Sequence, residues 1–266
     1  MPDDVVLTEV RDGVAVITLN RPEARNAINH ALGARLPEVV AELDARDDVA
    51  VMILTGADPA FCAGADLKEL GSREGTGADA LSVYDADGRL PYRGPFAPRT
   101  KLLIGAVNGP AITGGFELAL NCDFLVASER ARFADTHARV GILPGWGLTV
   151  LLCQSVGVRR ARELSATGNY LSAEQALTWG LVNHVVPHEE LLTFTRGIAA
   201  AIAGNNAEAV GELMRCYERV VNVTGDDAWD VEARVNFDWI SRTYDPAVIA
   251  ARRDAVVERG RSQNRG

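Results

Sequence analysis

Two short apolar runs near the start of the chain predict a β-hairpin. Val5–Val10 and Val14–Leu19 are rich in valine, isoleucine and threonine, and Arg11-Asp12-Gly13 separates them. Residues of this kind favour strands, and an Asp-Gly pair supplies the backbone conformation that a tight hairpin turn requires.

The next elements predict a layered α/β fold. An apolar stripe recurs at helical spacing, formed by Leu32, Leu36, Val39, Val40 and Leu43, and it predicts an amphipathic helix. Val49–Thr55 and Leu102–Val107 are continuous apolar runs, which are typical of strands buried on both faces. A strand, a helix and a buried strand in this order indicate α/β layers.

The rest of the chain divides into a mixed core and a helical end. Residues 71–100 are the least regular and predict one short helix and a loop. Short strands are expected at Phe124–Ala127 and Arg132–Ala134, and helices at Arg159–Ala166, Ser172–Trp179 and Glu189–Ala203. We expect a core at 1–200 and a helical region at 201–266, because the pattern of the second region offers helices and no convincing strand.

Composition and charge indicate a globular protein and argue against several classes of binding partner. The 266 residues are 47% hydrophobic, and 27 basic against 36 acidic residues give a net charge of −9. This excess of acid disfavours broad binding to nucleic acid or to an anionic membrane. Val140–Val158 carries no charge, but Pro144 and the glycines there prevent one regular membrane-spanning helix. Four scattered cysteines and an acidic start without a signal-peptide pattern predict a cytoplasmic protein.

The first candidate site is the segment Phe61–Lys68, immediately after a predicted buried strand. Its small residues, Ala63, Gly64 and Ala65, let a ligand approach the backbone closely, and the new helix leaves N–H groups free. The alternative is a tight turn whose small residues serve only packing.

The second candidate repeats this arrangement after Leu102–Val107. Gly114-Gly115 opens a helix, and Glu117 follows three residues after Gly114. A backbone donor and a carboxylate one turn apart can face one cavity, which suggests an oxyanion hole with a general base. The alternative is a first-turn glutamate that only favours the helix dipole. The motifs of a serine-hydrolase elbow and of a P-loop are both missing from the sequence.

Four ordered motifs carry a family resemblance. NRPEARNAIN, AFCAGADLKEL, AVNGPAITGGFELALNCD and FADTHARVGILPGWG closely resemble, in order and spacing, the motifs of the enoyl-CoA hydratase/isomerase (crotonase) family, over roughly 5–187. The resemblance implies an α/β fold, a crotonase-like spiral of β-β-α turns with a helical C-terminal region. It also implies trimers or dimers of trimers that bind acyl-CoA.

The same resemblance assigns roles to individual residues. It implies that the N–H groups of Ala65 and Gly114 bind the thioester oxygen and that Glu117 activates water. The residues expected along the coenzyme A site are Ala63, Ala65, Asp66, Leu67 and Lys68. Coenzyme A arrives as part of the substrate, and no further cofactor or metal is expected.

The chain departs from the hydratase pattern at His137. The second acid of the hydratases lies at a fixed distance before the Gly141-Ile142-Leu143-Pro144 run, and here His137 holds that place. An imidazole can exchange a proton near neutral pH, so His137 can replace the acid, oriented by Asp135. The alternative is a polar residue that lines the pocket and moves no proton.

Basic side chains near the first site are candidates to bind the phosphates of coenzyme A. They are Arg21 and Arg25, together with Lys68, because guanidinium groups match phosphate oxygens. The alternative is a solvated loop.

Three functions remain open at this stage. The leading hypothesis is an enoyl-CoA hydratase-like lyase of fatty acid metabolism. A Δ3-Δ2 enoyl-CoA isomerase is the close rival, since one base and an oxyanion hole suffice for that reaction. The third is a catalytically weak acyl-CoA-binding protein, and a thioester hydrolase is unsupported.

Overall fold

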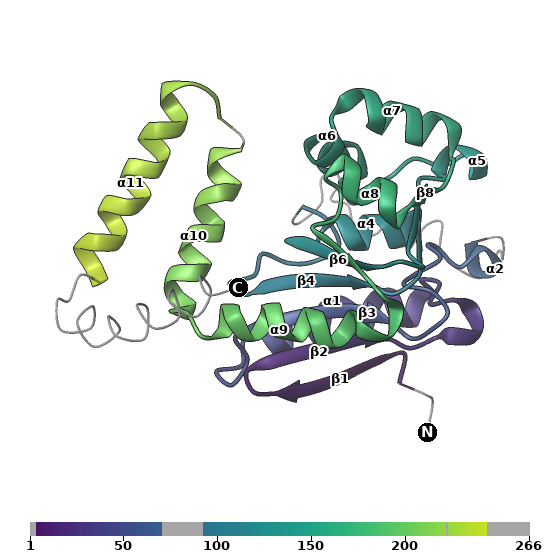
Figure 1. The fold of residues 1–266 in the computed structure, drawn as a ribbon, viewed down its shortest axis with the longest axis horizontal. Helices are drawn as coiled ribbons and strands as arrows, with labels where there is room; N and C mark the ends of the chain where they lie inside the picture. Colours follow the sequence, from purple (N-terminus) through teal and green to yellow (C-terminus); the bar gives the residue numbers. More distant parts are fainter. Residues whose placement is uncertain (1–3, 71–92, 222, 244–266) are drawn as a thin grey trace. The chain divides into compact units, whose positions relative to one another are not determined.

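The computed structural model describes residues 4–70, 93–221 and 223–243, and the chain forms two compact units, Met1–Gly211 and Glu212–Gly266. The first unit carries every strand that the structure describes (Figure 1). The irregular segment predicted at 71–100 lies mostly outside the described residues.

The predicted hairpin is confirmed. β1 (Val6–Arg11) pairs with β2 (Val14–Leu19) in antiparallel register, from Val6 opposite Leu19 to Arg11 opposite Val14. Asp12 and Gly13 both have positive φ, 52° and 76°. A two-residue turn of this hand matches the twist of the flanking strands.

Two sheets form the core of the first unit. The larger has the order β1-β2-β3-β4-β6-β9, and all its pairs after the hairpin are parallel. Its remaining strands are β3 (Val51–Gly56), β4 (Leu102–Val107), β6 (Phe124–Ser128) and β9 (His184–Val186). The smaller sheet has the order β5-β7-β8, formed by β5 (Pro110–Ile112), β7 (Arg132–Ala134) and β8 (Leu171–Ser172). From β4 onward the chain passes back and forth between the sheets, with β4, β6 and β9 in the larger and β5, β7 and β8 in the smaller.

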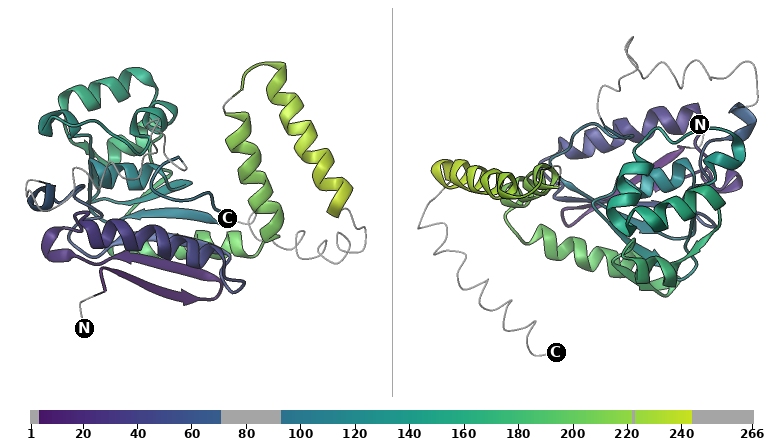
Figure 2. Two further views of the ribbon diagram at one scale, coloured as in Figure 1. Left: turned by 180° about the vertical axis from the view of Figure 1, so that it is seen from behind. Right: turned by 90° about the horizontal axis from the view of Figure 1, so that it is seen from above.

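Every residue of β3 and β4 is buried, as their continuous apolar runs predict. α9 (Leu191–Ala203) packs across β2, β3, β4 and β6. α1 (His30–Asp44) buries its whole predicted apolar stripe, and Figure 2 shows α1 and α9 on opposite sides of the strands. Both faces of the central strands are therefore covered.

Short helices complete the first unit. They are α2 (Leu67–Leu70), α4 (Gly114–Leu120), α5 (His137–Val140), α6 (Leu148–Val156), α7 (Val158–Thr167) and α8 (Ala173–Trp179). The Ser172 hydroxyl caps α8 by accepting a hydrogen bond from Gln175 N, as the capping-box spacing predicts. Two 3₁₀ turns, η1 (Pro22–Ala24) and η2 (His188–Glu190), lie in loops.

In the described part of the chain, α9 is followed by α10 (Ala207–Val220) and α11 (Asp226–Thr243). The division between the compact units falls after Gly211, inside α10. The sequence places its boundary at 200/201, which falls inside α9. The role in assembly that the family resemblance implies for the region after this boundary stays a prediction.

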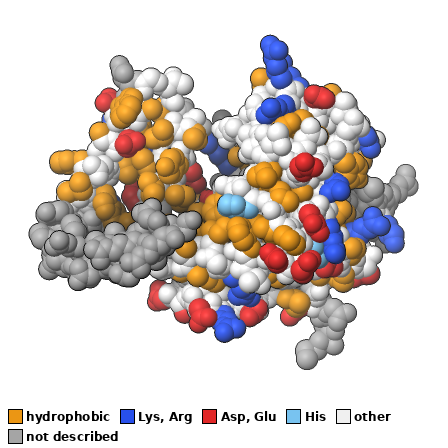
Figure 3. Space-filling view, in the orientation of Figure 1, with side chains coloured by type: hydrophobic (Ala, Val, Ile, Leu, Met, Phe, Trp, Pro, Cys, Tyr) orange, Lys and Arg blue, Asp and Glu red, His pale blue; other side chains and the backbone are white. Residues whose placement is uncertain are grey.

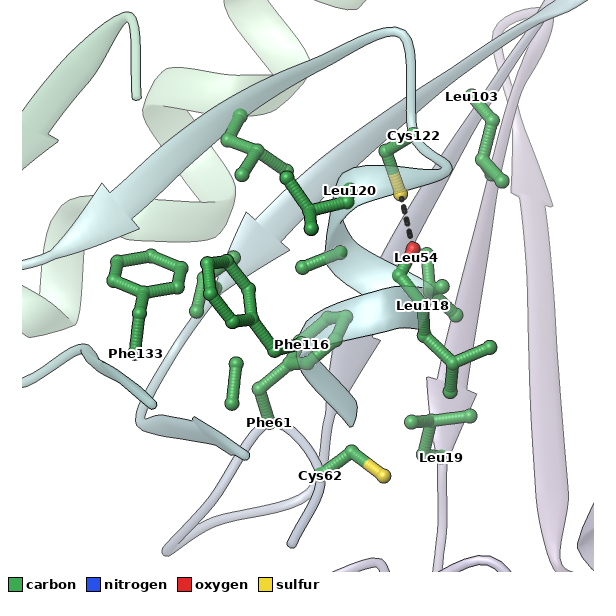
Figure 4. Close-up of a cluster of buried hydrophobic side chains, with 14 of the residues drawn as sticks. Leu19, Leu54, Phe61, Cys62, Leu103, Phe116, Leu118, Leu120, Cys122 and Phe133 are labelled. Carbon is green, nitrogen blue, oxygen red and sulfur yellow. Dashed lines mark hydrogen bonds between the residues drawn. The ribbon is translucent and has the colours of Figure 1, made fainter. Parts of the chain in front are cut away.

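Buried aromatic side chains fix the helix that carries Glu117. Phe116 of α4 contacts Phe133 of β7, with ring centroids 5.5 Å apart. Figure 4 shows Phe61 beside this pair and Cys122 donating to the Leu118 carbonyl. Since all three phenylalanines are fully buried, α4 and the end of β7 are held in one rigid core.

Candidate active site

The two candidate turns are joined through their backbones. Cys62 N donates to Pro110 O at 3.1 Å, and Ile112 N donates to Cys62 O at 2.9 Å. A Cβ atom at Gly115 would lie 2.1 Å from Cys62 O, and one at Gly64 would lie 2.7 Å from Ile112 O. Glycine is therefore required at both positions because the two backbones approach so closely.

This pairing brings two uncommitted N–H groups together. A Cβ atom built on Gly114 would lie 3.8 Å from Ala65 N. Gly114 is the first residue of α4, so its N–H has no acceptor within the helix. Within the part of the chain that the structure describes, neither Ala65 N nor Gly114 N donates to a protein group. Such a pair of donors can bind a carbonyl oxygen that gains negative charge.

Thr113 holds the backbone just before the Gly114 donor in a strained conformation. Its φ is 54° and its ψ is −115°, outside the regions that a β-branched residue favours. Thr113 N donates to Ala134 O at 2.9 Å, and the hydroxyls of Thr113 and Thr136 are 2.5 Å apart. These bonds tie the start of α4 to the turn that carries His137.

Glu117 is buried and held on both sides. Its side chain is 4% exposed, and its Oε1 accepts a hydrogen bond from Trp146 N at 2.6 Å. Asn121 Nδ2 donates to the carbonyl oxygens of both Glu117 and Trp146, at 2.8 Å each, and so fixes the loop to the helix. With Oε1 occupied by the Trp146 amide, Oε2 lies 3.5 Å from His137 Nε2.

His137 lies between two carboxylates. Its Nδ1 is 2.6 Å from Asp135 Oδ1, and its Nε2 is the nitrogen that contacts Glu117. Burial alone would lower the pKa of His137, but the hydrogen bond to Asp135 and the carboxylate of Glu117 outweigh it and raise the pKa to about 9. The two carboxylates therefore favour the protonated form of the imidazole.

Asp135 stabilises this cation. Burial would raise the pKa of its carboxyl, but hydrogen bonds from His137 and from Ser165 of α7 lower the pKa below its ordinary value. The three side chains thus form a chain of alternating charge, from Asp135 through His137 to Glu117.

The structure places the predicted binding residues around the first turn. Ala63 N donates to Arg25 O at 3.0 Å, so the 21–26 loop lies against the turn that holds Ala65. Arg25 and Lys68 are exposed, and neither side chain has a partner among the described residues. Leu67 begins α2, and its side chain lies outside the described part of the structure.

Arg21, a candidate to bind phosphate, is paired within the protein, and its phosphate role stays a prediction. Both terminal nitrogens of Arg21 lie 3.1 Å from Asp66 Oδ2, and Arg21 Nη1 also donates to Ala27 O. The Arg21 and Asp66 side chains are only 16% and 13% exposed. The guanidinium is therefore part of the scaffold of the turn, and Asp66 contributes to the site through its backbone and this ion pair.

The sequence analysis did not predict four residues that shape this site, namely Trp146, Asn121, Thr113 and Thr136. Trp146 acts through its backbone N–H, for which the sequence carries no signal. The positive φ of Thr113 could not be predicted either, because glycine usually occupies such positions.

The described residues include no group of three or more side chains that could hold a metal ion. His188 contacts Asp58 and Ser128, and His184 packs edge-on against Phe194. No helix that the structure describes is long and apolar enough to cross a membrane.

Comparison with known proteins identifies this arrangement. A family model described as enoyl-CoA hydratase/isomerase matches residues 9–246. The chain belongs to the enoyl-CoA hydratase/isomerase family. A probable peroxisomal enoyl-CoA hydratase of Arabidopsis thaliana is 44% identical over 196 residues, which are 73% of this chain and 70% of that protein.

Solved structures of the same family share the fold. An enoyl-CoA hydratase of Mycobacterium tuberculosis is 47% identical, with a TM-score of 0.74 over 88% of this chain and 98% of the other. One from Mycobacterium marinum is 31% identical, with a TM-score of 0.82 over 95% and 96%. The predicted family and crotonase-like fold are confirmed, and the enzyme class expected from the motifs is the one that these relatives carry in their names.

Proposed function

We propose that this member of the hydratase/isomerase family is an enoyl-CoA hydratase, adding water across the C2–C3 double bond of a 2-enoyl thioester. The observation that carries the proposal is the buried Glu117 carboxylate, one helical turn from the free N–H of Gly114 and in contact with His137. A base, an acid and an oxyanion hole are the three parts that this addition requires.

The proposed steps use Glu117 as the base, His137 as the acid and the two N–H groups as the oxyanion hole. Glu117 Oε2 takes a proton from water while the water oxygen bonds to C3. The π electrons move toward the thioester oxygen, where the N–H groups of Ala65 and Gly114 stabilise the enolate. His137 Nε2–H then gives its proton to C2. The proton on Glu117 returns to His137 across the 3.5 Å that separates them, and the site is restored.

Coenzyme A binding rests on the exposed cations near the first turn. Arg25 and Lys68 offer unpaired positive charge beside the Ala63–Asp66 backbone, and a guanidinium and an ammonium both bind phosphate. We propose that coenzyme A enters only as part of the substrate and that no metal or other cofactor takes part. Full activity after exhaustive dialysis against a chelator is the expected result.

We propose that the C-terminal helices assemble copies of the chain into a trimer or a dimer of trimers. Large apolar side chains on these helices are exposed: Leu213 (52%), Tyr217 (60%), Trp229 (74%) and Phe237 (72%). Figure 3 shows apolar side chains gathered on this unit. Monomeric proteins rarely leave such a surface in water, and a solution mass near 28.5 kDa would contradict assembly.

A cytoplasmic location is also part of the proposal. Its support is that the four cysteines are all free, as expected in a reducing compartment. Cell fractionation with a specific antibody tests it.

The second candidate function is a Δ3-Δ2 enoyl-CoA isomerase. The direct contact between Glu117 Oε2 and His137 Nε2 favours it, because a proton taken from C2 by one group can be stored on the pair and delivered to C4. In this reaction no water adds to the substrate.

One experiment separates these functions. The protein is incubated with crotonyl-CoA and, separately, with a 3-enoyl-CoA, and hydrated and isomerised products are followed by mass spectrometry. We expect rapid hydration of crotonyl-CoA that is lost selectively in His137→Gln. Isomerisation without hydration would make the second candidate correct, and binding without turnover of either thioester would leave a catalytically weak acyl-CoA-binding protein.

A further inference from the structure

Asp135 contacts His137 through two bonds at once. It lies in the turn between β7 and α5, and its Oδ1 accepts hydrogen bonds from both the backbone N and the ring Nδ1 of His137, at 3.1 and 2.6 Å. A carboxylate that binds both groups fixes the position of the residue and the orientation of its ring. The opposite nitrogen, Nε2, is thereby directed to Glu117.

The surroundings of the ring add no competing cation. The charged groups that face His137 among the described residues are Asp135 from its own turn and Glu117 from α4. α7, which packs on α5, contributes the neutral Ser165 as a further hydrogen-bond partner of Asp135. Arg139 of α5 turns away and donates to Thr167 O.

We infer that Asp135 is a positioning residue that keeps the His137 imidazole protonated and aims its Nε2–H into the active site. The inference rests on the proposed function for its catalytic meaning, but the protonation of His137 can be measured without turnover. Asp135 touches no reacting atom and acts entirely through His137.

The consequence is a hydratase whose proton donor, His137, is positively charged before it gives up its proton. Where the motif pattern of the hydratases has a second carboxyl group, this site has a cationic acid beside its carboxylate base. A neutral imidazole that keeps its one proton on Nδ1, facing Asp135, would have none on Nε2 for C2. The negative charge of Asp135 favours a proton on both nitrogens and so makes histidine usable as the acid at this position. The pKa of about 9 for His137 agrees with this geometry.

The test is a pH titration of the histidine ring signals by NMR on the whole protein without substrate. The chain has four histidines, and His137→Gln identifies the His137 signal by its loss. In the wild type we expect both ring nitrogens of His137 to carry protons at pH 7.5. In Asp135→Asn, which keeps an acceptor oxygen but removes the charge, we expect the midpoint to fall by about 1–3 pH units.

Asp58→Asn is the matched control, because it removes the carboxylate that contacts another histidine, His188. It should leave the His137 midpoint unchanged. A neutral His137 at pH 7.5 in the wild type would overturn the inference, and this measurement holds even if Asp135→Asn fails to fold. An unchanged midpoint in a folded Asp135→Asn would overturn it equally.

The activity measurement distinguishes this inference from the proposed function. With crotonyl-CoA, the alkaline limb of kcat should move down in Asp135→Asn by the same interval as the NMR midpoint, whereas a purely structural loss would lower kcat at every pH alike. If the wild type does not hydrate crotonyl-CoA but the titration behaves as expected, the proposed function fails and the role of Asp135 stands. If the wild type hydrates crotonyl-CoA but the alkaline limb of kcat is the same in Asp135→Asn, the proposed function stands and the role of Asp135 fails.

Discussion

Two aspartate–histidine pairs in this protein have similar distances and different surroundings. His137 lies 2.6 Å from Asp135 and 3.5 Å from Glu117. His188 lies 3.0 Å from Asp58 and 3.1 Å from the Ser128 hydroxyl. On distances alone, the second cluster resembles the Asp–His–Ser arrangement of a hydrolase.

Burial and the remaining hydrogen bonds separate the two clusters. The Asp135 side chain is 4% exposed and the Asp58 side chain is 61% exposed, so water screens only the second pair. The fully buried Ser128 hydroxyl also accepts a hydrogen bond from Arg130 N, and both of its partners are structural. The His137 cluster instead adjoins two N–H groups without an acceptor among the described residues. A cluster of hydrogen-bonded polar side chains is a candidate active site when nearby N–H donors remain available to a substrate, and the His137 cluster meets this condition.

The largest effect is expected from Glu117→Gln. The variant keeps the size of the side chain and an acceptor for the Trp146 amide but removes the base, and general acid–base groups contribute about 10²–10⁴-fold. We expect kcat for crotonyl-CoA to fall within that range while the Kd for an acyl-CoA changes little. Full kcat in the variant would place the base elsewhere and would erase the distinction between the clusters.

The free donors beside Glu117 are tested by Gly114→Ala. The new Cβ would meet only Ile28 Cδ1 closely, at 3.3 Å, and would lie 3.8 Å from Ala65 N, in the space where an oxyanion would bind. The variant keeps the N–H of residue 114, but its methyl group would hold the thioester oxygen away from that donor. Losing the use of one such donor costs about 2.7–4 kcal/mol in the barrier, so we expect kcat to fall about 10²–10³-fold with the fold intact.

Gly115→Ala is the matched comparison for that variant. Its Cβ would lie 2.1 Å from Cys62 O, so the two turns would have to separate. We expect a loss of stability in thermal unfolding, which Gly114→Ala should not show. Wild-type activity in a folded Gly114→Ala would remove the oxyanion hole from this position.

Much of the fold could be predicted because its signals are local. The hairpin turn, the stripe of α1 and the buried runs of β3 and β4 each follow from residues within one element. The short strands β8 and β9 were not predicted, because their own residues do not distinguish them from the loops and helices around them. They exist only through pairing with distant strands.

The candidate site divides in the same way. Glu117 and His137 could be placed from motif spacing, and Asp135 from its proximity in sequence. The ion pair of Arg21 with Asp66 joins residues 45 positions apart, so the loop sequence alone could not predict it. The Trp146 amide that holds Glu117 is a backbone group, and any residue except proline would supply it.

The pH dependence of stability should distinguish the two histidines. The pKa of His137 is raised from its ordinary 6.5 to about 9 in the folded protein. A raised pKa stabilises the fold fully below about pH 6.5, and this contribution is lost as the pH rises toward 9. We expect the free energy of unfolding in urea to decline over this interval in the wild type, and His137→Gln to lack that decline. If His137→Gln keeps the full decline of unfolding free energy with pH, another titrating group causes that decline.

The smallest effect is expected from His188→Gln, which tests the other side of the comparison. The change removes contacts to Asp58 and to the Ser128 hydroxyl. Because Ser128 keeps the Arg130 amide and Asp58 keeps its hydrogen bond from Asn108 Nδ2, neither oxygen is left without a partner. A hydrogen bond of this kind contributes about 0.5–1.5 kcal/mol, so we expect a small decrease in the free energy of unfolding. The decline of stability between pH 6.5 and 9 should persist, and kcat for crotonyl-CoA should stay within about twofold of the wild type. A tenfold or greater loss of kcat in a folded His188→Gln would mean that the His188 cluster also takes part in the reaction. Burial of the aspartate would then no longer distinguish the two aspartate–histidine pairs.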